Sequence, residues 1–74
     1  MKREFTCVPV SAAAVRGFVA GCLDRLRASD ETRFEVLVAV TEAVANVVRH
    51  APTTGRFEVD CVAEGRSVVV TVRD

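Results

Sequence analysis

The sequence contains neither tryptophan nor tyrosine, and its four phenylalanines bring the aromatic content to only 5% of 74 residues. Its formal net charge is zero, and the basic residues are scattered rather than clustered. Nucleic acids require a positively charged surface, and single strands are usually held on aromatic stacking platforms. The composition therefore argues against direct nucleic-acid binding.

Long apolar segments are also missing. No stretch approaches the roughly 20 apolar residues needed to cross a bilayer, and the first ten residues, MKREFTCVPV, lack the continuous apolar run of a secretory signal. The three cysteines, Cys7, Cys22 and Cys61, are odd in number, widely spaced and without a C-x-x-C pair. Because each falls at an apolar-periodic position, we interpret them as reduced core residues of a cytoplasmic protein that does not bind membranes.

What the sequence does contain is sufficient for one small folded domain. The chain is 50% hydrophobic and 27% charged, which is typical of globular rather than disordered proteins. A length of 74 residues supports a single domain at most. We therefore assign residues 1–74 to one domain.

The first third of the sequence predicts a strand followed by a helix. Residues 3–10 (REFTCVPV) alternate weakly and end near Pro9, which is typical of a short edge strand. Ser11 is the expected N-cap of the helix. Behind it, apolar residues recur at helical intervals as far as Leu26.

The remainder predicts a second helix and a hairpin. Ser29 or Asp30 caps the second helix, which continues to about Ala51 before a Pro- and Gly-containing turn. Residues 57–64 and 67–74 alternate as two strands joined by a second turn. The order β-α-α-β-β predicts an α+β fold, a two-layer sandwich in which helices cover one face of a sheet.

The second predicted helix carries polar side chains within an apolar run, TEAVANVVRHA, at residues 41–51. Glu42, Asn46 and His50 are spaced four residues apart and fall within an arc of about 80°, at about 100° per residue. Such a stripe is most simply a solvent-exposed face, and His50 would suit the C-terminal end of a helix. Asn46 fits that interpretation less well, because Asn is a mediocre helix former whose side chain competes for backbone hydrogen bonds.

The same stripe also suits catalysis. Glu42 could take a proton from a nucleophile, and the amide oxygen of Asn46 is a suitable ligand for Mg²⁺. Arg49 and His50 could neutralise phosphate oxygens. Together these groups would serve phosphoryl transfer, which depends on positioning, metal and charge. Zinc is a weaker alternative, because it needs three or four ligands and the chain offers one His without a nearby Cys.

The segment VAVTEAVANVVRHA resembles the N-box of the GHKL ATPases, in the branch of the anti-sigma factor serine kinases and histidine-kinase-like ATPases, where a helix shows E-A-x-x-N-x-x-x-H. The matching residues are Glu42, Ala43, Asn46 and His50. The resemblance implies an ATP-binding, Bergerat-type α/β sandwich, with residues 1–74 matching its N-terminal half. The final residues, VVVTVRD, are similar to the entry of the family's D-x-G-x-G box, which makes Asp74 its Asp.

The resemblance also implies a role for each matching residue. Glu42 corresponds to the general base that activates the attacking hydroxyl, and Asn46 to the Mg²⁺ ligand that bridges to the ATP phosphates. Arg49 matches an often basic position near phosphate, and His50 a common residue of the branch. Asp74 matches the carboxylate that accepts a hydrogen bond from the adenine amino group. The implied partners are a sigma factor and an antagonist protein that is phosphorylated on serine.

The sequence departs from the family pattern at its end. Both glycines of the D-x-G-x-G box, the ATP lid and the second glycine box are absent. We therefore expect a truncated domain that binds ATP weakly and lacks kinase activity alone. One alternative is a non-catalytic module that contacts a sigma factor, or a second copy of itself through an open sheet edge. Another is a small α+β domain whose stripe is merely solvated.

Overall fold

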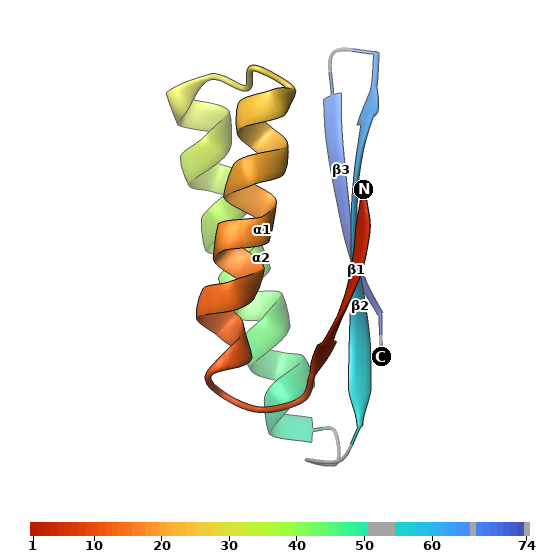
Figure 1. Cartoon of the computed structure of the whole chain (residues 1–74). Coiled ribbons are helices and arrows are strands. Elements are labelled where there is room, and N and C mark those ends of the chain that lie inside the picture. Colours follow the sequence, from red (N-terminus) through yellow and green to blue (C-terminus); the bar gives the residue numbers. More distant parts are fainter. Residues whose placement is uncertain (51–54, 66, 74) are drawn as a thin grey trace.

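The computed structural model describes residues 1–50, 55–65 and 67–73, and it has two layers, a three-stranded antiparallel sheet with two helices on one face (Figure 1). The predicted α+β class and the β-α-α-β-β order are confirmed. Within the described ranges, neither helix is long and apolar enough to cross a membrane. The expected ends of the second helix at Ala51 and of the last strand at Asp74 lie outside these ranges. The elements are β1 (Lys2–Thr6), α1 (Ser11–Arg25), α2 (Asp30–His50), β2 (Arg56–Glu64) and β3 (Ser67–Arg73).

The central strand of the sheet is β2, which pairs antiparallel with β1 on one side and β3 on the other. Phe57 of β2 lies opposite Phe5 of β1, and Val59 of β2 lies opposite Val72 of β3. Successive side chains of a strand point to opposite faces. This register therefore directs Phe5, Phe57 and Val59 toward the helices and leaves Glu4 and Glu58 on the outer face, where Val62 and Val69 are also exposed.

The hydrophobic core lies between the sheet and the two helices. The ring of Phe5 stacks on that of Phe57 with centroids 5.7 Å apart, and it meets Phe18 of α1 edge-on at 6.0 Å. Both arrangements are favourable for aromatic pairs. The buried core cluster comprises Phe5, Cys7, Val15, Val19, Leu23, Val40, Val44, Phe57 and Val59.

The start of α1 differs from the prediction. Ser11 is the first residue of the helix rather than its N-cap, and the N-cap residue Val10 makes no side-chain capping hydrogen bond. Instead the amide of Ser11 donates to the carbonyl of Val8 at 3.0 Å, so a backbone turn satisfies the first free donor of the helix. The predicted strand over residues 3–10 is also too long at this end, because β1 ends at Thr6 and residues 7–10 form the connection to α1.

The start of α2 selects one of the two predicted caps. The amide of Thr32 donates to Ser29 Oγ at 3.1 Å, which is an N-cap hydrogen bond. Arg33 in the next turn donates to the carboxylate of Asp24 in α1. This hydrogen bond lowers the pKa of Asp24 and connects the two helix ends that flank the turn.

Between the helices, Arg27 adopts a left-handed backbone with φ of 56°. The amide of Ala28 donates to the carbonyl of Leu23 at 3.0 Å, and that of Arg27 to the carbonyl of Asp24 at 3.1 Å. These two hydrogen bonds define a Schellman motif, in which glycine normally occupies the left-handed position. Arg27 therefore holds a conformation that is unfavourable for a residue with a Cβ atom.

Replacing Arg27 with glycine should raise the free energy of unfolding by about 1 kcal/mol, because glycine adopts the left-handed region without steric cost. Chemical denaturation followed by circular dichroism measures the change. Arg25→Gly is the matched control, and it should lower stability by about 1 kcal/mol because Arg25 lies within the helix. A loss of stability in Arg27→Gly would contradict the assigned strain.

All three cysteines are unpaired and buried, which confirms the prediction that they are core residues. Cys22 of α1 and Cys61 of β2 are neighbours, and Cys22 Sγ also lies 3.8 Å from Met1 Sδ. Burial, and secondarily the proximity of Cys22, raises the pKa of the Cys61 thiol to about 11. A thiol of this kind is unreactive at neutral pH.

The free energy of unfolding should therefore fall as the pH rises from about 9 to about 11. The Cys61 thiol ionises near its ordinary pKa of 9.0 in the unfolded chain but near 11 in the folded chain. Over this interval the unfolded state binds fewer protons, so a rise in pH favours unfolding. The chain has no tyrosine and only one lysine, so few other side chains titrate in this pH range. Thermal unfolding from pH 8 to 11 tests this, and an equally steep fall in Cys61→Val would refute it.

Candidate functional site

The rotation of α2 about its axis positions the polar stripe. Val40 and Val44, one turn apart, are the buried residues of this helix. Because each residue advances the helix by about 100°, this rotation directs Glu42 and Asn46 away from the core. Both are exposed, as is His50. The three residues thus form one continuous exposed line along the last turns of α2.

A groove of about 340 Å³ separates α2 from β3, and its walls are apolar. Asn46 and His50 extend the α2 wall, because they follow Ala43 by three and seven residues and therefore lie on the same side of the helix. An apolar groove with a few polar groups at one end suits a ligand that has both an apolar and an anionic part. The lining residues are Val36, Ala39, Val40 and Ala43 of α2, and Val68, Val70 and Val72 of β3.

The small residues Ala39 and Ala43 line the groove, although Ala39 was not predicted as a site residue and Ala43 was predicted only as part of the matching motif. They lie four residues apart, and Ala43 is three residues before Asn46. Their short side chains leave room between α2 and β3. The two alanines beside the polar stripe are visible in the sequence. Their role as part of a groove depends on the position of β3, which the sequence spacing does not give.

The structure does not bring every predicted site residue to this groove. Glu42 lines a different depression, between α1 and α2, which it shares with Arg16 and Phe34. Arg49 lines a third, beside Pro9 at the start of α1. Arg49 therefore borders the α1 side of α2, away from the groove, and its assignment as a phosphate contact stays a prediction.

The side chains of the stripe are available to a ligand. In the described ranges, Glu42, Asn46, Arg49 and His50 take part in no ion pair or side-chain hydrogen bond. The neighbouring Thr41 uses its hydroxyl internally, donating to the carbonyl of Leu37 at 2.7 Å. Binding at the stripe would thus break no ion pair or side-chain hydrogen bond among the described residues.

The last described residue of β3 lies at the same end of the molecule as the stripe. Arg73 is opposite Glu58, close to the start of β2, and β2 is the element that follows α2. Figure 1 accordingly shows the end of β3 and the end of α2 together in the lower half of the molecule. Asp74, the expected adenine contact, lies outside the described residues, and its role stays a prediction.

The amide oxygen of Asn46 is a donor of the kind that Mg²⁺ accepts when it is bound together with phosphate, whereas Glu42, one turn earlier, lines a different depression. Mg²⁺ commonly takes one or two protein oxygens and completes its octahedron with phosphate and water. In the part of the chain that the structure describes, no group of three or more His, Cys, Asp or Glu residues could hold a metal ion.

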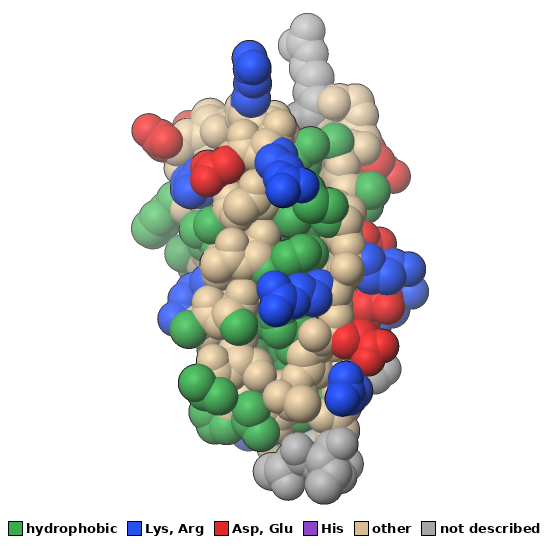
Figure 2. All heavy atoms as spheres, viewed as in Figure 1, with side chains coloured by type: hydrophobic (Ala, Val, Ile, Leu, Met, Phe, Trp, Pro, Cys, Tyr) green, Lys and Arg blue, Asp and Glu red, His purple; other side chains and the backbone are tan. Residues whose placement is uncertain are grey.

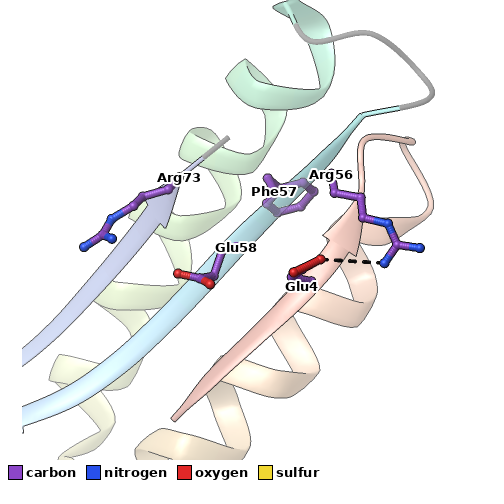
Figure 3. A pocket seen from close by; sticks show the side chains of 5 residues that line it. All are labelled: Glu4, Arg56, Phe57, Glu58 and Arg73. Atoms are coloured by element: carbon purple, nitrogen blue, oxygen red, sulfur yellow. Dashed lines mark ion pairs between the residues drawn. The ribbon is translucent and has the colours of Figure 1, made fainter.

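A second polar region lies on the outer face of the sheet, where a depression of about 280 Å³ is lined by charged side chains (Figure 3). Arg56 pairs with Glu4 at 3.7 Å, and Lys2 with Glu58 at 3.9 Å. Glu58 lies between Glu4 and Arg73 in the strand register. Exposed pairs of this kind contribute little to stability, and we interpret them as a solvated ladder of mixed charge.

Comparison with known proteins identifies the family of the chain. The sequence model of the histidine kinase-like ATPase domain matches residues 5–74, a range that includes the stripe and β3. The chain therefore belongs to the histidine kinase-like ATPase domain family, and the predicted GHKL resemblance is confirmed. A search of the curated proteins found no match.

Replacing Asn46 with alanine should raise the free energy of unfolding by about 0.5 kcal/mol, because alanine is the better helix former and no internal contact is lost. Chemical denaturation followed by circular dichroism measures it. Glu35→Ala is the matched control at another exposed position of α2, and it should change stability by less than about 0.3 kcal/mol. A clear loss of stability in Asn46→Ala would assign Asn46 a structural role instead.

Proposed function

We propose that the protein binds Mg-ATP beside the end of α2 and acts as an anti-sigma factor serine/threonine kinase. In this proposal it holds a sigma factor in the cytoplasm and phosphorylates a serine of an antagonist protein. Membership of an ATPase family supports nucleotide binding. Support for the site comes from the spacing along α2, because Asn46 and His50 follow Ala43, a lining residue of the groove between α2 and β3, by three and seven residues.

Each residue of the stripe has a distinct role in the proposal. Asn46 would hold Mg²⁺ through its amide oxygen, and the bound ion would supply positive charge against the phosphates. His50, and more remotely Arg49, would donate hydrogen bonds to phosphate oxygens. Asp74 would accept a hydrogen bond from adenine.

Glu42 would accept the proton of the attacking hydroxyl. It lies one turn before Asn46 and lines the depression between α1 and α2. A serine hydroxyl of a protein substrate would therefore approach over the two helices, whereas the nucleotide would lie toward β3. This separation gives the two substrates different routes to the same stretch of α2.

A second candidate function is a non-catalytic module that binds a sigma factor or a second copy of the chain. The exposed side chains of Phe34 and Val38 favour it, because clustered exposed apolar residues often mark protein contacts. A second copy would pair along the outer edge of β3. The two candidates differ in whether Mg-ATP engages Asn46.

Titration of the ¹⁵N-labelled 74-residue chain with ATP, with and without Mg²⁺, distinguishes them. We expect weak binding, because residues 1–74 include the N-box and none of the glycine boxes, with amide shifts at residues 43–50 and 68–72. Asn46→Ala should lower the affinity at least about 5-fold with Mg²⁺ and less than about 2-fold without it.

Glu35→Gln serves as the control for this titration, because Glu35 is exposed on α2 but lines none of the three depressions beside that helix. It should leave the affinity within about 2-fold of the unmodified chain. Equal losses in Asn46→Ala with and without Mg²⁺ would remove Asn46 as a metal ligand. Shifts confined to the outer face of the sheet would refute the proposed nucleotide site.

A further inference from the structure

The depression between α1 and α2 is mostly apolar and has a volume of about 390 Å³. We call it the helix-pair depression. Phe34 is 71% exposed and Val38 is 45% exposed, while Leu37 and Thr41 are half-buried between them and α1. Figure 2 shows hydrophobic side chains at the surface along the helix side of the molecule. The lining residues are Arg16, Phe34, Leu37, Val38, Thr41 and Glu42.

The fold itself gives no reason for an aromatic residue at this surface. The other three phenylalanines, Phe5, Phe18 and Phe57, pack against one another in or beside the core. Phe34 is the exception, and Val38 lies one turn further along α2 on the same side. Exposed apolar groups that adjoin in this way are characteristic of surfaces that bind another protein.

The α1 side of the depression permits close approach. Ala13 and Ala20 are three and four residues from Arg16, which places them on the same side of α1. Between them lies Gly17, where an added Cβ atom would meet nothing within 4 Å. Small side chains reduce the distance at which two helices can pack. A helix from another protein could thus lie close to the backbone of α1 while covering Phe34.

Charged residues surround the apolar centre unequally. Glu31, Glu35 and Glu42 follow one side of α2 at intervals of four and seven residues, and all three are exposed. Arg16 is on the α1 side. Within the described ranges none of these four charges takes part in an ion pair. An apolar centre with a charged rim is the usual anatomy of a protein interface.

We propose that the helix-pair depression docks an amphipathic helix of a protein partner. The apolar stripe of that helix covers Phe34 and Val38, and basic side chains on one of its flanks meet Glu31, Glu35 and Glu42. The proposal assigns a contact surface to one of the two protein partners of the proposed function, and in that respect it rests on the proposed function. Because Glu42 lines the depression, the docked helix lies next to the proposed base.

A second copy of this chain is a poorer occupant, because the surface is not self-complementary. A two-fold axis parallel to α2 would set three carboxylates of one copy against the single Arg16 of the other, so two of the three carboxylates would lack a cation. An axis perpendicular to α2 would set carboxylates against carboxylates, and like charges across an interface are unfavourable. The charge pattern therefore selects a different protein with a basic flank.

Two synthetic 18-residue helices provide the probe. Both carry the same leucine stripe, and one is flanked by lysines where the other has glutamates. Titrated into the ¹⁵N-labelled chain without nucleotide, the lysine-flanked helix should bind at least about 10-fold more tightly. Its amide shifts should centre on residues 13–20 and 31–42.

Substitutions locate the contact. Phe34→Ser and Val38→Ser should each weaken binding at least about 10-fold, and both positions are exposed, so the fold should be retained, as circular dichroism can check. Gly17→Gln has room in the free chain and should weaken binding by obstructing the approach. Val62→Ser is the matched control, because Val62 is 43% exposed on the outer face of the sheet, and it should change affinity less than about 2-fold.

Three results would overturn the proposal: equal affinity for both helices, no binding of either, and amide shifts on the outer face of the sheet. A fourth is a dependence of the Phe34 and Val38 signals on protein concentration without peptide, which would assign the surface to a second copy. Because no nucleotide is present, failure of this experiment leaves the Mg-ATP titration unaffected. Failure of that titration likewise leaves the docking result intact.

Discussion

The burial of Val40 and Val44 determines the rotation of α2, and each surface of functional interest follows from that rotation. With these two valines inward, Ala43 turns toward β3 and opens the groove, while Phe34 turns outward beside α1. A change of one residue in the helical phase would rotate every one of these groups by about 100°. It would also turn Asn46 toward the core without a hydrogen-bond partner, and burying an unpaired polar group costs free energy. Core packing and site geometry are therefore one constraint in this domain.

α2 consequently borders three different environments. One side packs on the sheet, a second continues into a groove whose far wall is β3, and a third lies open beside α1. Glu42 and Asn46 are one turn apart on the same exposed line, yet Glu42 lines the depression beside α1, whereas Asn46 follows Ala43 of the groove beside β3. The proposed kinase activity would require a nucleotide and a protein substrate to meet without competing for the same space, and the two depressions that flank α2 would provide separate places for them.

The elements of the fold could largely be predicted because they depend on local periodicity. The alternation in β2 and the helical intervals of α1 and α2 are present in the sequence itself, and so is the four-residue spacing of the stripe. The start of α1 could not be predicted, since the helix begins at Ser11 without a side-chain cap and the amide of Ser11 donates instead to the backbone carbonyl of Val8. The left-handed position after α1 is occupied by Arg27 rather than glycine, so the sequence gives no signal for it. Which depression Arg49 lines depends on where α1 lies, and no spacing along α2 contains that information.

The position of β3 at the edge of the described sheet affects how the protein behaves at high concentration. Its sequence SVVVTV contains four valines and a threonine and carries no charge before Arg73. Uncharged β-branched segments of this length can stack into cross-β fibrils when their backbone groups are free. Pairing with β2 on one side and cover by α2 on one face sequester much of the segment. Unfolding would expose these backbone groups, and the charge of Arg73 at the end of the segment would then oppose stacking.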